Sequence, residues 1–365
     1  MKKRILFYIQ VPPPIHGTSI VNEIVSNNTS IREDFDVTVI KTIYNKTISS
    51  VGVLSFYKLL MYLKFTYLFI QKLIILSPEI VYLSVVPSGK IFYRDALTIL
   101  LAKLFRKKIV LHIHGIGISK ATENSISRFF YTIIYKNCFA VTTSNALIKD
   151  LGFIQNAINK VYVVYNGISP LKEIAVPKNK DIINFFYLSS IMGLKGQLVL
   201  LKAIKNLKQR GFKNFKCTIT GQVVDQNYYN ELTRYVHVNH LQDHISLGKG
   251  VYGSDKEFNF SKSDVFIFPS YADAFGLVAI EAMSLGKPVI ASDMGSIREI
   301  ITDRTGYIFK PGDDNQLSYL MEKFIKDKNL ADKMRGSVLK QFNNNFTLER
   351  FNENMYKTFL DISNF

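Results

Sequence analysis

One stretch of the sequence decides the fold: Phe268–Ser292, FPSYADAFGLVAIEAMSLGKPVIAS. It begins where the apolar run Val265–Phe268 ends, passes through a loop, and enters a helical pattern at Gly276. A second short apolar run, Pro288–Ala291, closes the stretch. Strand, loop, helix and strand in this order are typical of a βαβ unit in a buried parallel sheet.

The loop and helix of this stretch also suit an anion. The first N–H groups of a helix have no partner inside the helix, and the helix dipole adds positive potential there, so a diphosphate can bind. Asp273 lies in the loop, and Glu281 follows eight positions later. Two carboxylates beside an anion site indicate a nucleotide-sugar pocket, in which one acid holds ribose hydroxyls and the other the sugar. The structural alternatives are a helix cap for Asp273 and a simple turn for Gly276.

Outward from this stretch, strand-like runs alternate with helical patterns along the whole chain. The pattern occurs twice and is interrupted by Asn166–Lys180, which contains Gly and Pro and reads as a linker. The strand-like runs are Ile5–Gln10, Val37–Ile40, Ile80–Val85, Ile109–His114, Ala140–Thr143, Val161–Tyr165, then Ile183–Leu188, Cys217–Thr220, His244–Leu247, Val265–Phe268 and Pro288–Ala291.

This alternation predicts an α/β protein with two doubly wound domains, residues 1–172 and 173–347. Ligands of such folds bind at the carboxyl ends of the strands, so a cleft between the domains is the expected site. The final helical pattern, about residues 348–365, could pack back on the first domain.

Composition narrows the class of protein. The chain has 365 residues, 47% of them hydrophobic, which excludes disorder. Its two cysteines, Cys138 and Cys217, cannot form a disulfide framework and fit a reducing compartment. The net charge is +17, of which residues 1–175 carry +12 and the remainder +5. A positive excess indicates nucleic acid or an anionic membrane as partner. We expect no nucleic acid, because no nucleic-acid-binding motif is present.

The apolar segment Phe56–Leu76 is relevant to whether the protein spans or contacts a membrane. Lys58, Lys64 and Lys72 interrupt it, so we expect no membrane-spanning segment. Tyrosine and phenylalanine beside lysine suit a helix that lies at a membrane interface, whereas a solvated face is the alternative. A second basic cluster follows at 103–108. We expect a cytoplasmic protein, peripheral on the inner face of the cell membrane.

The stretch Phe268–Ser292 resembles the E-x7-E region of retaining glycosyltransferases of family 4, which have the GT-B fold of two Rossmann-like domains facing across a cleft. Further pieces occur in the family's order, and together they cover the chain. They are Phe7–Gly17 with its Pro-Pro-Pro-Ile-His-Gly, Leu111–Gly115, Val141–Ser144, Val164–Gly167, Gly221, Met294–Glu299 and Thr305–Asp313.

The resemblance assigns roles in the second domain. Glu281 would bind ribose, and Lys195, with the helix that starts near Gly276, would meet the charge of the leaving diphosphate. Asp273 stands where the family usually has Glu, and would act on the sugar. Ser190 stands in the donor site where the family has Arg, and Arg298 could supply the missing charge. The sugar and phosphate subsite would also be lined by Phe275 and Leu277.

In the first domain, His114 would face the transferred sugar, and Gly17 would let its loop approach the diphosphate. His16, beside Gly17, is the candidate for acceptor binding. His114 could equally be a core histidine, and His16 an ordinary loop residue. His112 is expected to be structural.

The activity implied is transfer of a sugar from a nucleoside-diphosphate sugar to a glycan or polyprenyl-linked acceptor, with retention of configuration, in cell-surface polysaccharide synthesis. The family implies neither a metal nor a cofactor, and the histidines at 237, 240 and 244 are expected to be structural or exposed. Asp273 and Ser190 favour one alternative: a catalytically weak or inactive paralogue that binds nucleotide sugar or scaffolds an assembly complex.

Overall fold

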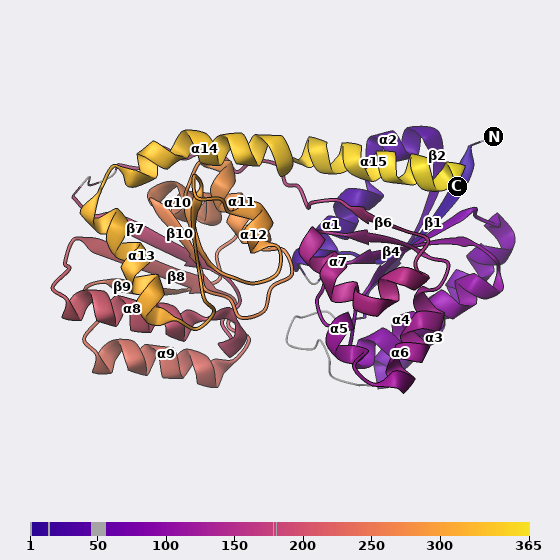
Figure 1. The fold of residues 1–365 in the computed structure, drawn as a ribbon, viewed down its shortest axis with the longest axis horizontal. Helices are drawn as coiled ribbons and strands as arrows, with labels where there is room; N and C mark the ends of the chain where they lie inside the picture. The colour runs from indigo at the N-terminus through magenta and orange to yellow at the C-terminus, as the bar shows by residue number, and fades with distance from the viewer. Residues whose placement is uncertain (1, 14, 45–55, 178, 180) are drawn as a thin grey trace. The chain divides into compact units, whose positions relative to one another are not determined.

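The computed structural model describes residues 2–13, 15–44, 56–177, 179 and 181–365. The chain divides into two compact units (Figure 1). The first contains Met1–Gly167 and Leu348–Phe365, and the second Ile168–Thr347. The first unit therefore ends five residues before the boundary expected at 172, and it takes the last helix of the chain.

The first unit is built on a parallel sheet of six strands. In spatial order they are β2 (Phe35–Thr42), β1 (Lys3–Gln10), β3 (Ile80–Val85), β4 (Lys108–Ile113), β5 (Phe139–Thr142) and β6 (Lys160–Val163). Strands β1 and β2 pair along their full length, from Lys3 opposite Phe35 to Gln10 opposite Thr42. From β1 the chain moves first to one side and later to the other, so the switch point of the sheet lies between β1 and β3.

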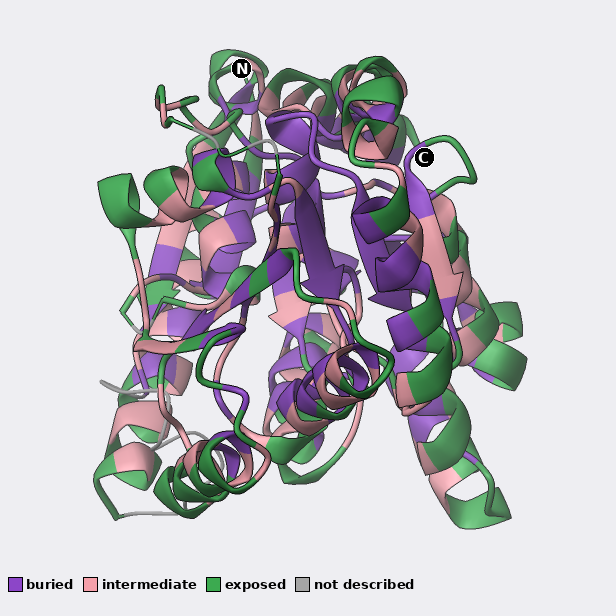
Figure 2. Ribbon diagram, turned by 90° about the vertical axis from the view of Figure 1, so that its left-hand side faces the viewer, coloured by how far each residue is buried: buried purple, intermediate pink, exposed green. Residues whose placement is uncertain are grey.

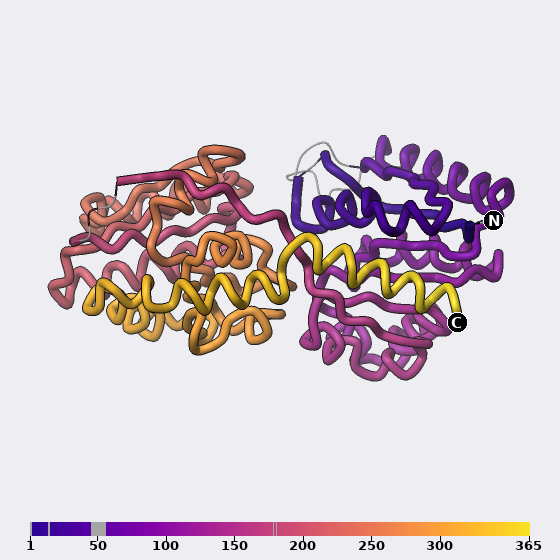
Figure 3. Tube along the Cα trace, turned by 90° about the horizontal axis from the view of Figure 1, so that it is seen from above, coloured from indigo at the N-terminus to yellow at the C-terminus, as the bar shows by residue number. Residues whose placement is uncertain are grey.

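Helices of the first unit form two groups. One group consists of α1 (Gly17–Ser26), α2 (Thr29–Asp34) and the last helix, α15 (Leu348–Asn364), which contacts both of the others. The ring of Phe359 in α15 lies within 5.6 Å of the rings of Phe7 and Tyr82, measured between centroids. The last helix is therefore part of the core of this unit, and the tube in Figure 3 shows its return.

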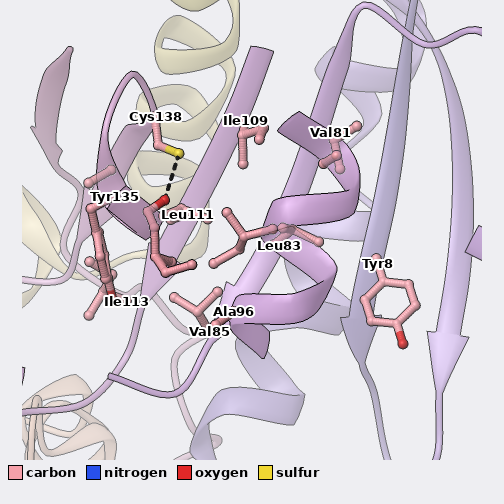
Figure 4. Packing of buried hydrophobic residues seen from close by; sticks show 14 of the residues in the cluster. Tyr8, Val81, Leu83, Val85, Ala96, Ile109, Leu111, Ile113, Tyr135 and Cys138 are labelled. Atoms are coloured by element: carbon pink, nitrogen blue, oxygen red, sulfur yellow. Dashed lines mark hydrogen bonds between the residues drawn. The ribbon is translucent and has the colours of Figure 1, made fainter. Parts of the chain in front are cut away.

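The second group of helices covers the other face of the sheet. It comprises α3 (Phe56–Leu76), α4 (Lys90–Leu104), α5 (Ile118–Ala121), α6 (Ser125–Tyr135), α7 (Asn145–Leu151) and the 3-10 helix η2 (Gly152–Ala157). Leu83 and Leu111 of the strands pack beneath this layer with Tyr135 of α6 in one apolar cluster (Figure 4). Alternate strand residues thus serve the two helical layers, as a sheet buried on both faces requires.

Helix α3 departs from expectation. Its 21 residues include an 18-residue window of mean hydropathy 1.6, so by length and composition alone α3 could cross a membrane. The lysines therefore do not by themselves exclude a span, and the expectation of no membrane-spanning segment stays a prediction. The helix packs against β1, β2 and α4, with Phe65, Phe69 and Leu73 buried.

The second unit repeats the architecture. Its parallel strands, in spatial order, are β12 (Gly306–Phe309), β11 (Val289–Ser292), β10 (Val265–Phe268), β7 (Ile183–Leu188), β8 (Phe215–Gly221) and β9 (Ile245–Lys249). The helices are η3 (Gly193–Lys195), α8 (Gln197–Gln209), α9 (Gln226–Val238), α10 (Gly253–Lys262), α11 (Leu277–Ser284), α12 (Ile297–Ile300), α13 (Asp314–Lys326) and α14 (Leu330–Asn345). Five of these strands were predicted, and β12 was not.

Both sheets are buried at their centres, and Figure 2 shows buried strands in purple. In the second unit, Phe185, Phe266 and Ile290 are at most 1% exposed. Strands buried on both faces read as continuous apolar runs, which is why they could be recognised in the sequence. This rigid support lies directly behind the loops that carry the candidate site.

Candidate active site

The switch point of the second sheet brings two loops together. Strand β7 pairs with β10 on one side and with β8 on the other, and all three are parallel. The loop that follows β7 and the loop that follows β10 therefore leave the same edge of the sheet, side by side. This is the position at which open α/β sheets bind ligands.

Lys195 and Asp273, predicted from different parts of the sequence, meet at this edge. The Lys195 Nζ lies 2.9 Å from the Asp273 Oδ2 and also donates to the Ala272 carbonyl at 2.9 Å. The backbone of Lys195 is itself held, since its carbonyl accepts a hydrogen bond from the Tyr187 hydroxyl. Both side chains of the ion pair are about one-quarter exposed or less (20% and 26%). A ligand can therefore reach the pair, while the protein fixes its position.

Close backbone contacts hold the two loops. Gly196 has φ +76°, and a Cβ there would lie 2.0 Å from the carbonyl oxygen of Pro269. The Asp273 loop is fixed from its other side, because Ser296 donates to the Ala274 carbonyl through both its N–H (3.1 Å) and its Oγ (2.7 Å). The geometry of the Lys195–Asp273 pair thus depends on the backbone contact made at Gly196.

A Gly196→Ala substitution tests this dependence. The new methyl group would collide with the backbone of Pro269, and the alanine would have to keep an unfavourable positive φ. We therefore expect the free energy of unfolding to fall by about 1–3 kcal/mol. Gly193→Ala is the matched control, because its Cβ would have no neighbour within 4 Å, and its effect should stay within about 0.5 kcal/mol. Urea denaturation of both variants provides the measurement. Equal stability of the two would contradict the account.

Helix α11 follows the Asp273 loop with an uncapped N-terminus. Its N-cap, Gly276, adopts the left-handed conformation (φ +88°, ψ +57°), and no side chain caps the helix. A Cβ at Gly276 would meet the ring of Phe268 at 3.2 Å. The Ala279 N–H donates to the Gly276 carbonyl at 2.9 Å, so the N–H groups of Leu277 and Val278 are the ones that an anion can use, with the helix dipole behind them.

Glu281 lies one turn into α11, and only one of its two carboxylate oxygens has a hydrogen-bond partner in the described part of the chain. Its Oε1 accepts a hydrogen bond from the Lys256 Nζ at 2.8 Å. Its Oε2 is buried and has no hydrogen-bond partner within the described part of the chain. Sequence reasoning missed Lys256, which lies on the polar helix α10 in no recognisable motif. A buried carboxylate oxygen without a partner is well suited to accept a hydroxyl hydrogen of a ligand.

The other residues predicted for this site differ in their burial and in their contacts. Phe275 is 5% exposed, and its ring packs edge-on against Phe346, so its side chain supports the loop. Leu277 is half-buried at the start of α11. Ser190 lies beyond the end of β7, and its carbonyl accepts a hydrogen bond from the Gln197 amide. Arg298, the candidate replacement cation, forms an ion pair with Asp293.

A second candidate region is a cavity of about 390 Å³ in the first unit. It lies at the carboxyl ends of β1, β2, β3 and β4, which include the switch point of that sheet. One wall is apolar and includes Leu83, Val85 and Ile91. His16 and His114, both predicted to face substrates, line this cavity.

The polar side of the cavity is a hydrogen-bonded network. The Arg94 guanidinium forms an ion pair with Asp95 at 2.6 Å and lies 4.5 Å from the centre of the Tyr44 ring. Asp95 also accepts the Val86 N–H at 3.0 Å, and the hydroxyls of Tyr8 and Tyr44 are 2.7 Å apart. No local sequence motif predicts this network, because its members come from three strands or their loops and from α4.

The three histidines of this region have distinct surroundings. His16 is the N-cap of α1, where its Nδ1 accepts the Ser19 N–H at 3.3 Å, and Gly17 is the first residue of that helix. The ring of His112 is fully buried and hydrogen-bonded to the Tyr82 hydroxyl. The His114 ring lies 3.9 Å from that of His112, and its Nε2 is buried without a hydrogen-bond partner in the described residues.

These surroundings keep His114 neutral. Burial lowers the pKa of His114 to about 3, with a smaller contribution from His16. The ordinary histidine pKa is about 6.5, so the unfolded chain binds more protons than the folded chain between these two values. Stability linked to His114 is complete above about pH 6.5 and is lost as the pH falls towards 3.

We therefore expect the unfolding free energy to decrease on acidification below about pH 6.5, with His114 contributing up to about 1.4 kcal/mol per pH unit. Urea denaturation across this range should show a smaller decrease for His114→Asn than for the wild type. His240→Asn, at an exposed histidine, is the control. Identical pH profiles for His114→Asn and the wild type would show that His114 is not the group responsible.

Comparison with known proteins agrees with the geometry of the second unit. Residues 171–340 match the sequence model of the family described as glycosyl transferases group 1. The second unit is therefore similar to this family along nearly its whole length. The matched range contains the loop after β7, the loop after β10 and helix α11, and so includes Lys195, Asp273 and Glu281.

Two curated relatives of this chain illustrate the similarity. An uncharacterized glycosyltransferase of Methanocaldococcus jannaschii is 28% identical over 262 residues, covering 70% of this chain and 68% of the relative. The capsular polysaccharide biosynthesis glycosyltransferase CapM of Staphylococcus aureus is 29% identical over 186 residues, covering 48% of this chain and 46% of CapM. The chain thus spans only about half the length of CapM in this comparison.

Solved structures show the fold of the whole chain. A glycosyltransferase from Rickettsia africae matches with a TM-score of 0.75 at 20% identity, covering 99% of this chain and 98% of the other. Anabaena HepE, solved in complex with UDP, matches with a TM-score of 0.73 at 15% identity, covering 98% and 100%. The chain therefore has the GT-B fold expected from its sequence, with two Rossmann-like units.

Proposed function

We propose that the chain transfers a sugar from a nucleoside-diphosphate sugar to a glycan or polyprenyl-linked acceptor, with retention of configuration. One observation carries this proposal. At the switch point of the second unit, the Lys195–Asp273 pair stands at the entrance to an uncapped helix, which carries Glu281 with one carboxylate oxygen unused. These groups match the charged parts and the hydroxyls of such a donor.

The donor would be recognised in two parts. Its diphosphate would accept hydrogen bonds from the first-turn N–H groups of α11 and from the Lys195 Nζ. The ribose would donate a hydroxyl hydrogen to the Glu281 Oε2, while Lys256 orients the carboxylate through Oε1. HepE, which has the same fold at low sequence identity, was solved with UDP, and this supports a nucleotide as ligand.

Transfer would break the bond between the anomeric carbon and a phosphate oxygen and form a bond from that carbon to an acceptor oxygen. Charge develops on the leaving phosphate, where Lys195 and the N-terminus of α11 stabilise it most in the transition state. The leaving phosphate can take the acceptor's proton on the same face, which retains configuration. Asp273 lies beside Lys195 to hold the sugar. No resident metal or cofactor is part of this proposal.

The cavity of the first unit would receive the acceptor. Its apolar wall suits the carbon framework of a sugar or lipid, and the network around Arg94 and Tyr44 offers polar and cationic contacts. His16 and the neutral His114 would provide hydrogen bonds at the same cavity. CapM is by name a capsular polysaccharide biosynthesis enzyme, and this supports a role in cell-surface polysaccharide synthesis. We propose that this synthesis takes place in the cytoplasm.

Incubation with a panel of radiolabelled nucleotide sugars and polyprenyl-linked acceptors tests the proposal. We expect labelled product with one class of donor, also in the presence of EDTA, and a product with the anomeric configuration of the donor by proton NMR. A product of inverted configuration would overturn retention. Donor binding without turnover, whatever the acceptor, would instead favour the non-catalytic paralogue that Asp273 and Ser190 suggest.

A further inference from the structure

Three neighbouring helices of the first unit expose apolar residues to solvent. We call this surface the α3–α4–α6 face. In α4 the exposed apolar residues recur every three or four positions, which places them on one side of the helix. The same holds for α6 and for most of α3. The members are Phe56, Leu60, Leu63, Tyr67 and Ile74 of α3, Tyr93, Leu97, Leu100 and Leu104 of α4, and Ile126, Phe129 and Ile133 of α6.

This distribution differs from that in an ordinary helical layer, because the outward side of the helices is apolar as well. A helix that packs on a sheet usually directs its apolar side to the core and its polar side to water. Helix α3 buries Phe65, Phe69 and Leu73 against the sheet, yet Tyr67 on its opposite side is 67% exposed. Leu104 of α4 is 77% exposed and Ile126 of α6 is 84% exposed. Apolar patches of this extent on a soluble unit indicate a binding surface.

The three helices form one continuous layer. Helix α4 contacts α3 on one side and α6 on the other. The Lys103 Nζ ties α4 to the end of α6, since it donates to the carbonyls of Ile133 and Lys136 at 2.6 Å each. Figure 1 shows α3, α4 and α6 side by side at the same face of the unit. Their exposed apolar rows therefore belong to a single surface.

The positive charge of the segment that contains α3, α4 and α6 indicates which kind of partner this face would bind. Residues 56–136 contain twelve Lys and Arg and only three Asp and Glu. One of those acids, Asp95, is buried in its ion pair with Arg94. Lys64, Lys90 and Arg106 are exposed on or next to the apolar rows. A surface that combines apolar side chains, tyrosines and an excess of positive charge is complementary to an anionic lipid bilayer.

We propose that the α3–α4–α6 face lies flat on the anionic surface of a bilayer. The leucine, isoleucine and phenylalanine side chains enter the boundary between headgroups and acyl chains, and the tyrosine hydroxyls and lysine ammonium groups stay among the headgroups. A second copy of the chain is a poorer occupant, because it would bring two basic surfaces together. Insertion of α3 across the membrane would remove Phe65, Phe69 and Leu73 from the core in which they are buried.

This inference extends the proposed function without depending on it, because lipid binding requires neither donor nor transfer. Sedimentation of the purified full chain with vesicles measures it. We expect binding to phosphatidylcholine vesicles that contain phosphatidylglycerol, weaker binding as salt is added, and little binding to phosphatidylcholine alone.

The variant Leu60→Glu with Leu97→Glu removes one apolar residue from each of two helices and adds negative charge. Both leucines are exposed (49% and 47%), so the fold should be kept, and thermal unfolding should confirm this. We expect the vesicle partition coefficient to fall roughly tenfold or more. The matched control, Val238→Glu with Tyr319→Glu, changes two exposed apolar residues of the second unit and should bind vesicles like the wild type.

Several outcomes would overturn the proposal. One is equal binding of the wild type to neutral and anionic vesicles, and another is unchanged binding of the Leu60 and Leu97 variant. Extraction of the protein only by detergent would identify α3 as a membrane span. A concentration-dependent dimer that the Leu60 and Leu97 changes dissolve, with no vesicle binding, would assign the face to a second copy. Transfer to a water-soluble acceptor is measured separately, so failure here leaves the enzymatic proposal intact.

Discussion

Glu281→Ala should lower sugar transfer by about 10–10²-fold, because the ribose loses the carboxylate oxygen that accepts its hydroxyl hydrogen. A hydrogen bond to a charged group contributes about 1.5–3 kcal/mol, which corresponds to this range. The fold should survive, since the side chain is only partly buried and Lys256, its partner, is 24% exposed and can be hydrated. Steady-state kinetics with the preferred donor measure the effect, and thermal unfolding checks the fold.

Two controls separate the role of Glu281 from general damage to the unit. Glu231→Ala removes an exposed carboxylate of α9 and should leave kcat/KM unchanged. Lys256→Ala removes only the group that orients Glu281, so it should cost less than Glu281→Ala. Near-normal transfer by Glu281→Ala would refute the assignment of the ribose site.

Lys195→Ala is expected to slow transfer by about 10²–10³-fold, through the loss of roughly 3–4 kcal/mol of transition-state stabilisation. The ammonium group meets charge that grows on the leaving phosphate, so kcat should fall along with donor affinity. Because Ser190 is neutral, it cannot compensate for the lost positive charge. Single-turnover kinetics measure the effect on the chemical step, and equilibrium binding measures the effect on donor affinity.

Lys202→Ala provides the control for Lys195, since Lys202 is an exposed lysine of the following helix, α8. Lys195→Arg keeps a cation and should recover part of the rate. An unchanged kcat in Lys195→Ala would mean that another group stabilises the leaving phosphate.

The sequence predicted the fold because its strands are buried on both faces. Eleven strand-like runs stood out as short apolar segments between helical patterns. The twelfth strand, β12, was not predicted because Gly306–Phe309 begins with a glycine, a residue depleted in strands. That glycine is required by packing, since a Cβ at Gly306 would lie 1.9 Å from the Val289 carbonyl oxygen.

The site was predictable where a local pattern fixes the geometry. Asp273, Gly276 and Glu281 belong to one loop and helix, so their spacing along the chain determines their spacing in space. Lys256 comes from a different helix, and only the tertiary fold brings its ammonium group to Glu281. The Arg94–Asp95 network of the first unit was not predicted, because there too the tertiary fold brings the residues together.

Helix α3 shows the limit of counting charges along a segment. Lys58 and Lys72 are each seven residues from Phe65, which places them on the packed side of the helix. The outward side is left to Leu60, Leu63 and Tyr67. Composition therefore suggested an interrupted apolar segment, whereas the helical arrangement produces an exposed apolar row.

A crystal structure with a bound nucleoside diphosphate tests the central claim most directly, using the nucleotide that stabilises the protein most in a thermal-shift panel. Our account predicts the diphosphate within hydrogen-bond distance of the Lys195 Nζ and of the first N–H groups of α11, with a ribose hydroxyl on the Glu281 Oε2. A nucleotide bound without contact to Lys195 or Glu281 would contradict it.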